Sequence, residues 1–295
     1  MPPADMPQIT VIVATKGRPD ALAETLENVA RCDPAPAAVL VVDGDEHRSA
    51  LAVVEASGLP GARHIASDPG LPHQRNVGLR QSGSAITCFL DDDVIVEPDI
   101  LGHLAAVYAD PAVVGATGTV NEPATGRAGG AGSALRDLVQ RGGPEGTMTS
   151  FGYPRRLGPG AAPAQVEFMP GCLMSARTEV ARRVGFDEHL PGYALAEDED
   201  FSYRLSREGA IALVPQARLF HKSYGVLRSR QRAFNRQLVV NRTYLFRKNF
   251  EQTWRARAGF AGLMAVLIAH RLLNREWQGI AGLADGFRDV AAGRL

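Results

Sequence analysis

Three consecutive aspartates, Asp91 to Asp93, directly follow the apolar run of residues 85–90. A short run rich in β-favouring side chains predicts a buried strand, so the aspartates mark the point where this strand leaves the core. Neighbouring carboxylates repel one another and cannot be buried without partners. An extended backbone points Asp91 and Asp93 to the same side. The pattern is typical of a solvated acidic turn, or of a hard cation held by carboxylate oxygens.

A second acidic cluster, residues 197–200, stands just before Phe201 and Leu205. Acids are favoured in the first turn of a helix, so a capped helix with an Asp200–Arg204 pair is one interpretation. The other interpretation is a carboxylate that acts as a general base and removes a proton from an attacking group. The residues alone leave this choice open.

The elements that would position these acids alternate between strands and helices. Runs rich in β-branched residues predict strands at residues 9–15, 39–43, 63–67, 85–90, 113–120, 166–175 and 211–214. Helical patterns follow Pro19 and Pro98, cover residues 72–80 and begin again at the second acidic cluster. This alternation predicts an α/β fold with a mostly parallel sheet flanked by helices. Such sheets bind ligands at the carboxyl ends of their strands, where Asp43 and Asp91 both lie.

The turn after the first predicted strand contains Thr15 and Arg18. It has neither the G-x-G-x-x-G nor the G-x-x-x-x-G-K-[ST] spacing, which argues against a dinucleotide fold and a P-loop. Both residues still lie where a strand-to-helix turn would meet an anion. Farther along, residues 121–165 are rich in Gly, Pro and Ala, and we expect a mobile loop beside the site.

The composition is that of an ordinary globular chain of 295 residues, long enough for one large domain or a domain with an appendage. Its three cysteines have no metal-ligand or redox spacing, which fits a reducing compartment. Residues 1–8 lack the basic and apolar regions of a signal peptide. The net charge is zero, but residues 218–275 contain 13 lysines and arginines and one acid. This net charge of +12 predicts an anionic surface or substrate near the C-terminal part.

From Arg228 onward the chain has a helical pattern, with arginines outside its apolar face. Residues 258–269 form an uncharged run of 12 residues. A spanning helix needs roughly 20 residues, so this run is too short to cross a bilayer. Two interpretations remain, a helix that lies in a membrane interface and a buried helix. We divide the chain into a catalytic domain, residues 1–225, and a basic, amphipathic helical extension, residues 226–295.

Taken in order, these motifs resemble those of family 2 glycosyltransferases with the GT-A fold. The resemblance covers residues 8–224 and rests on the strand end at Asp43, Arg75-Asn76-x-Gly78, Asp91-Asp92-Asp93 and Glu197-Asp198-x-Asp200. The bacterial rhamnosyltransferase-like branch is similar in the stretch 171–175, in Phe186-Asp187-Glu188, in Glu197-Asp198 and in His221. Many relatives have Asn after Gly-Cys where this chain has Leu173, so the identity of the acceptor is not carried over.

The resemblance implies donor contacts for residues near the strand ends, namely Thr15, Arg18, Asp43, Arg75, Asp91 and Asp92. Within this set, Arg75 would lie near the nucleotide or its diphosphate, and Asp91 nearer the ribose. Asp93 and His221 would hold a divalent cation, Mn²⁺ or Mg²⁺. As a Lewis acid, such a cation stabilises the charge that develops on a leaving diphosphate.

The same resemblance makes Asp198 the base that takes the proton of an acceptor hydroxyl. Its approach from the side opposite the leaving group implies one displacement with inversion at the anomeric carbon. Gly171, Cys172 and Glu197 are candidates for the acceptor side of the site. The acidic neighbours of Asp198 in the cluster compete with it for the role of base.

These expectations describe an inverting, metal-dependent glycosyltransferase that uses a UDP- or dTDP-sugar. The acceptor would be a hydroxyl of a cell-envelope glycan or a lipid-linked intermediate, with no nucleic acid as partner. The C-terminal part would make peripheral contact with an anionic membrane from the cytoplasm. Two rival functions remain. A nucleotidyltransferase is disfavoured by the turn at residues 16–19, and a non-catalytic sugar-nucleotide-binding protein by the intact Asp93, Asp198 and His221.

Overall fold

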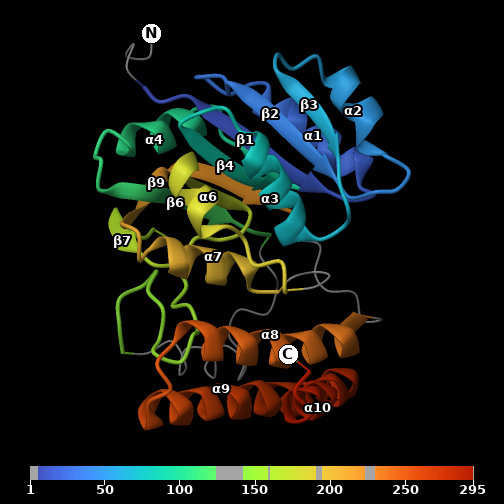
Figure 1. The fold of residues 1–295 in the computed structure, drawn as a ribbon, viewed down its shortest axis with the longest axis vertical. Helices are drawn as coiled ribbons and strands as arrows, with labels where there is room; N and C mark the ends of the chain where they lie inside the picture. The colour runs from blue at the N-terminus through green and yellow to red at the C-terminus, as the bar shows by residue number, and fades with distance from the viewer. Residues whose placement is uncertain (1–5, 124–141, 159, 191–194, 223–229, 295) are drawn as a thin grey trace. The chain divides into compact units, whose positions relative to one another are not determined.

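The computed structural model describes residues 6–123, 142–158, 160–190, 195–222 and 230–294 (Figure 1). Within them the chain forms two compact units. The first unit contains the residues up to 123 and those from 158 to 222, whereas the second contains residues 142–157 and the C-terminal helices. The division of the chain at residue 225 stays a proposal.

Within the described residues, the first unit is built around a nine-stranded sheet of order β3-β2-β1-β4-β8-β6-β9-β5, with β7 paired to β9. Four strands are parallel, namely β1 Ile9–Thr15, β2 Ala38–Asp43, β3 Ala62–Ala66 and β4 Ile86–Asp91. Nearly every residue of β1, β2 and β4 is buried, as expected for parallel strands covered on both faces. Thr15 pairs with Asp43 and Ala14 with Asp91, so three strands end together at one edge.

The other half of the sheet is mixed, with antiparallel pairs among its strands. It consists of β5 Val94–Val96, β6 Val113–Asn121, β7 Ala164–Val166, β8 Leu173–Arg177 and β9 Ala210–His221. β8 is antiparallel to β4 and β6, whereas β6 and β9 are parallel. The single strand expected at residues 166–175 is therefore wrong. Pro170, which has no backbone N–H to donate, lies in the break between β7 and β8.

The last strand, β9, is much longer than the expected strand at residues 211–214. It covers 12 residues and passes through Pro215, beside which the register with β6 shifts between Gly118 and Thr119. Such an irregularity tolerates a proline, because the ladder is already interrupted there. The extension matters for the site, because it carries His221 to a position opposite Val94 of β5.

The helices of the first unit are α1 Pro19–Val29, α2 Ala50–Ser57, α3 Leu71–Gln81, α4 Ile100–Val107, α6 Thr178–Val184 and α7 Glu197–Leu205. Leu22, Leu26 and Val29 lie on the buried face of α1. The sequence did not reveal α2 and α6, which are only two turns long and too short to show a clear period. The predicted α/β fold with a largely parallel central sheet is confirmed.

The second unit contains the helices α8 Gln231–Asn249, α9 Trp254–Leu273 and α10 Trp277–Ala291. Its small apolar core consists of Val239, Leu263, Met264 and Leu283. Residues 142–157 join this unit, since Arg242 donates to the carbonyl of Gly152 and lies over the ring of Tyr153. The predicted helical extension is confirmed. Residues 124–141 of the expected mobile loop lie outside the described residues.

Candidate active site

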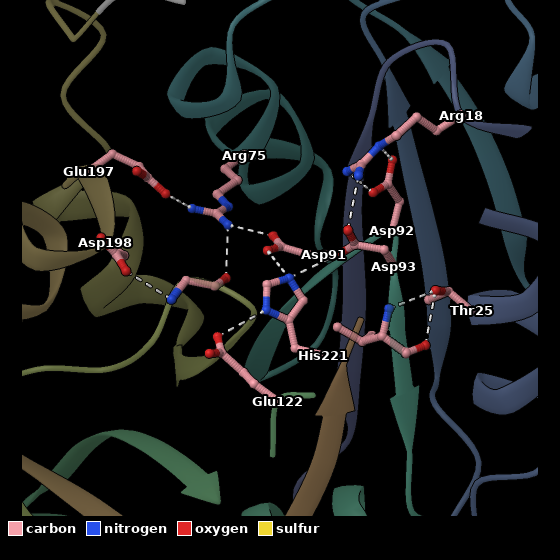
Figure 2. Close-up of polar contacts among 12 residues, drawn as sticks. Arg18, Thr25, Arg75, Asp91, Asp92, Asp93, Glu122, Glu197, Asp198 and His221 are labelled. Atoms are coloured by element: carbon pink, nitrogen blue, oxygen red, sulfur yellow. Dashed lines mark hydrogen bonds and ion pairs between the residues drawn. The ribbon is translucent and has the colours of Figure 1, made fainter. Parts of the chain in front are cut away.

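Asp91 and Asp93 lie where β4 ends and β5 begins, and β9 places His221 beside them (Figure 2). One ligand atom from each of the three residues lies within 4.8 Å of the others. His221 Nε2 is 3.2 Å from Asp93 Oδ1 and 3.8 Å from Asp91 Oδ2. The structure thus brings together the two expected metal ligands, Asp93 and His221. It adds Asp91, which we expected nearer the ribose.

The surroundings of Asp93 fit a divalent cation. Its side chain is almost fully buried, and its Oδ1 accepts no hydrogen bond from any described residue. A buried carboxylate oxygen without a donor is costly unless a positive charge compensates it. His221 Nε2 is close to this oxygen without hydrogen-bond alignment, as expected for two ligands that face one cation. Two carboxylates and an imidazole suit Mn²⁺ or Mg²⁺.

Neighbouring charges shift the pKa values of Asp93 and His221 in opposite directions. Burial opposes the charge on Asp93, but His221 and Arg18 outweigh it and lower the pKa of that carboxyl. Burial likewise opposes the charge on His221, and the nearby acids outweigh it and raise its pKa. Glu122 Oε1 lies 3.6 Å from His221 Nδ1, where a carboxylate can orient the imidazole. Glu122 was not among the predicted site residues, although it follows the end of β6 as the other acids follow β4.

Asp92 has a different environment from its two neighbours, because its side chain is completely buried. Thr15 Oγ1 donates to it at 2.6 Å, and the Arg18 guanidinium donates to both of its oxygens. Burial raises the pKa of Asp92 to about 6, against the charge of Arg18 and the hydrogen bond from Thr15. Arg18 also donates to Asp93 Oδ2 at 2.9 Å, and its side chain is 45% exposed. Asp92 therefore anchors the turn that presents Arg18 beside Asp91, Asp93 and His221, which we call the metal-type cluster.

Arg75 of α3 is fully buried between the two acidic clusters (Figure 2). Its guanidinium donates to Glu197 Oε1 at 2.5 Å and to Asp91 Oδ1 at 3.0 Å. It also donates to the carbonyl of Gly171 at 2.8 Å, and it lies 5.4 Å from the centre of the Phe186 ring. These contacts occupy the guanidinium within the protein, so Arg75 joins the end of β4 to the start of α7.

Asp198 lies in the first turn of α7, and its carboxylate is held at both oxygens. Oδ2 accepts from the backbone N–H of Gly171 at 3.0 Å, and Oδ1 accepts from that of Glu199 at 2.9 Å. Burial raises the pKa of Asp198 to about 6, and the charge of Glu199 adds to this effect. Burial and the charge of Asp198 together raise the pKa of Glu197, despite its bond to Arg75. Two acids with raised pKa values at one edge of a sheet are typical of acid–base chemistry.

The other candidates on this side of the site have structural partners. Arg204 donates to Asp200 Oδ2 at 2.9 and 2.6 Å, which confirms the expected pair within α7. Cys172 is buried, and burial raises the pKa of its thiol, so it is not a reactive thiolate. Gly171 contributes its backbone to Arg75 and Asp198.

Asp43 is completely buried at the end of β2. Its carboxylate accepts from the backbone N–H groups of Asp45 and Ala50, at 2.9 and 3.1 Å. The His64 ring lies 3.1 Å from the same carboxylate. Asp43 thus organises the loop that follows β2, and His64 is a partner that the sequence analysis did not predict. The contact between Asp43 and a nucleotide stays a proposal.

Comparison with solved structures defines the class of fold. PcManGT of Pyrobaculum calidifontis, a mannosyltransferase solved in complex with GDP-Man and Mn²⁺, is similar with 18% identity and a TM-score of 0.61. The match covers 99% of this chain and 77% of that protein. GalNAc-T7, solved with UDP, GalNAc and Mn²⁺, has 17% identity and a TM-score of 0.59 over 81% of this chain. TarS of S. aureus has 17% identity and a TM-score of 0.53 over 90% of this chain. The fold is that of GT-A glycosyltransferases.

The match to GalNAc-T7 covers 48% of that protein, and the match to TarS covers 43%, so this chain spans less than half of either. Within the GT-A class, the sequence identifies the family. The family described as Glycosyltransferase like family 2 matches residues 7–256, and the chain belongs to it. No curated protein matches the chain. The expected family 2 membership is confirmed, whereas the rhamnosyltransferase-like branch stays a proposal.

Proposed function

We propose that this glycosyltransferase moves a sugar, with inversion, from a UDP- or dTDP-sugar to a hydroxyl acceptor. One observation carries the proposal: the metal-type cluster and a half-buried acid, Asp198, lie at the same edge of the sheet and are joined through Arg75. The solved relatives are described with GDP-Man or with UDP and GalNAc, which supports a nucleotide-diphosphate donor. Their different bases do not choose the base for this chain.

A divalent cation held by Asp91, Asp93 and His221 would stabilise, as a Lewis acid, the negative charge that develops on the leaving diphosphate. Arg18 offers a further positive charge beside this cluster, and its partly exposed guanidinium is positioned by Asp92. Placing these charges before the reaction lowers the barrier, because they need no reorganisation as the bond breaks.

Asp198 would take the proton of the acceptor hydroxyl. A carboxylate has about four acceptor sites, so the two backbone donors at Asp198 leave capacity for this proton. With a pKa raised to about 6, Asp198 is ionised at neutral pH and is a stronger base than an ordinary aspartate. A base and a leaving group on opposite sides of the sugar imply one displacement with inversion.

We further propose membership of the rhamnosyltransferase-like branch and a cell-envelope glycan or lipid-linked acceptor, used at the cytoplasmic face of a membrane. Support for the branch comes from the Gly171–Ser175 motif, whose first residue binds both Arg75 and Asp198. Support for a reducing compartment comes from Cys32, Cys88 and Cys172, which are buried and form no disulfide.

The reaction can be tested by incubating the protein with UDP-, dTDP- and GDP-sugars, each with Mn²⁺ or with a chelator, and with a panel of hydroxyl acceptors. We expect release of a nucleoside diphosphate that requires the metal, and a product whose anomeric configuration by NMR is opposite to that of the donor. Retention of configuration would contradict a single displacement. Release of pyrophosphate would identify a nucleotidyltransferase, and metal-dependent donor binding without turnover on any acceptor or water would favour a binding protein.

A further inference from the structure

Helix α9 exposes an apolar face along its whole length. Residues of this face recur at helical spacing and are all exposed, namely Trp254, Ala258, Ala261, Ala265 and Leu272. An 18-residue window of the helix has a mean hydropathy of 1.4, yet only 17% of it is buried. A long exposed row of apolar side chains on a surface helix commonly marks a contact with another protein surface or with lipid. The exposed side of α9 therefore requires a further partner.

The opposite side of α9 is already occupied within its own unit. Leu263 and Met264 belong to the small core formed with α8 and α10. Near the start of the helix, the Phe260 ring stacks on that of Phe246 at 4.5 Å. These contacts fix one side of α9 against its own unit. The opposite side of the helix is therefore open to a partner along the length of the helix. A flat surface matches this geometry better than an enclosing groove.

Exposed tryptophans stand at the start of α9 and at the start of α10, which follows it. Trp254, at the first position of α9, is 74% exposed, and Trp277, at the first position of α10, is 66% exposed. Leu272 and Leu273, at the last turn of α9, are also exposed. Tryptophan is enriched at the boundary between lipid and water, because its ring is apolar and its N–H remains hydrated.

The charged residues around this face indicate what kind of surface it binds. α9 contains no aspartate or glutamate. Exposed cations stand in the last turn of α8, in the first turn of α9 and just after its end, namely Arg247, Lys248, Arg255, Arg257 and Arg275, against one exposed acid before α9, Glu251. Basic residues that flank an apolar face favour a negatively charged surface. A second copy of this chain would bring the same cations together, so self-association through this face is disfavoured.

We propose that the exposed face of α9, with the exposed Trp254 at its start, binds the surface of an anionic lipid bilayer and lies in its interfacial region. A helix of 20 residues is about 30 Å long, which is enough to cross a bilayer. Crossing would bring α8 and α10, which pack on the other side of α9, into the hydrocarbon together with their arginines. An interfacial position keeps these charged side chains in water. This proposal concerns binding alone and does not depend on the proposed transfer reaction.

The full chain reports on this contact without a label, because Trp254 and Trp277 are its two tryptophans. The experiment adds vesicles of phosphatidylcholine, with or without phosphatidylglycerol, and records both tryptophan emission and co-sedimentation. We expect a blue shift and sedimentation with the anionic vesicles, and both effects should weaken as salt is raised. Lipids brominated near the headgroup should quench the emission more than lipids brominated at the chain ends.

Two variants place a carboxylate in the centre of the face, Ala261→Glu and Ala265→Glu. Both sites are exposed, so the fold has no reason to change. Each variant should bind anionic vesicles at least about tenfold more weakly, because a buried carboxylate at the interface is costly and is repelled by the lipid. Ala52→Glu, at an exposed position of α2, makes the same change of charge in the first unit and should bind as the parent does.

Several results would overturn the proposal. One is an emission spectrum that no vesicle shifts, and another is unchanged binding by Ala261→Glu and Ala265→Glu. Stronger quenching from the chain ends would show that α9 enters the hydrocarbon rather than the interface. A blue shift that depends on protein concentration without vesicles, together with a doubled mass in light scattering, would assign the face to a second copy of the chain.

Discussion

At the scale of single residues, the three consecutive aspartates have three different environments. Asp92 points inward, where Thr15 and Arg18 satisfy it. Asp93 keeps one buried oxygen without a donor among the described residues, and Asp91 is shared between Arg75 and His221. β4 ends at Asp91 and β5 begins at Val94, so the turn between the two strands sends Asp92 inward and Asp93 towards His221. The same three residues therefore anchor a turn and build a metal-type site.

Replacing Asp198 by asparagine should remove turnover and leave donor binding unchanged. The amide has nearly the same size but cannot accept the proton at neutral pH. A general base contributes roughly 10²–10⁴ in rate, or about 3–5 kcal/mol of barrier. The change should appear in kcat, measured with saturating donor, and not in the donor affinity measured by calorimetry. Glu199→Gln, one residue along the helix, is the control and should be milder. Near-normal turnover in Asp198→Asn would show that another acid is the base.

The pH dependence of turnover follows from the raised pKa of Asp198, which burial shifts to about 6. The base must be ionised, so kcat should fall about tenfold per unit as the pH drops below this value and should level off above it. An ordinary aspartate would keep its activity down to about pH 4. The measurement is kcat against pH at saturating donor and metal. A limb that is still present in Asp198→Asn would have to belong to a different group.

At the scale of elements, the close packing of α3 on β1 sets the position of Arg75. A Cβ atom at Gly78 would lie 2.6 Å from Ile12 Cγ2, and Ile12 is almost fully buried. The helix can therefore approach the strand only because this residue has no side chain. Arg75, almost one turn earlier on the same helix, is carried in this way to the edge where β1, β2 and β4 end together.

Gly78→Ala should destabilise the fold, although alanine is the better helix former. Helix propensity favours alanine by about 1 kcal/mol, whereas overpacking of a tight core costs about 1–3 kcal/mol. We expect a net loss of up to about 2 kcal/mol in the free energy of unfolding, measured by denaturant titration. Gly83→Ala is the matched control, because a Cβ there meets nothing within 4 Å. Equal stability of the two variants would show that α3 can move away from β1 at little cost.

The sequence predicted the parallel strands and the acids at their ends, because these signals are local. Each strand is a short β-branched run, and Asp91 to Asp93 follow one of them directly. The partners of these acids are not local: Arg75 joins residues more than one hundred positions apart, and His221 arrives through a strand that contains Pro215. Our prediction ended this strand at residue 214, and the register shift that tolerates Pro215 has no signature in the sequence.

At the scale of the whole molecule, the sequence separates the two kinds of charge. The acids that form the candidate site lie in the first unit, whereas the net charge of +12 falls on residues 218–275, most of which belong to the second unit. Each unit also has its own apolar core. The candidate chemistry and the proposed contact with lipid therefore occupy different parts of the chain, and variants can test them separately.

Donor and metal together should raise the stability of the folded chain. A ligand that binds only the folded state stabilises it by about 2.7 kcal/mol at a hundred times its Kd. For a chain of 295 residues, with an unfolding entropy of about 2.1 cal/mol/K per residue, that corresponds to an increase in melting temperature of about 4 °C. We expect this increase with UDP or dTDP plus Mn²⁺, detected by circular dichroism, and its loss with a chelator or in Asp93→Asn. The exposed Asp20→Asn is the control and should retain this increase.

Both tryptophans lie in the second unit, so the transition detected by their fluorescence should move less than the one detected by circular dichroism. Equal movement of both would mean that the units unfold together, and an unchanged increase in Asp93→Asn would remove Asp93 from the metal site.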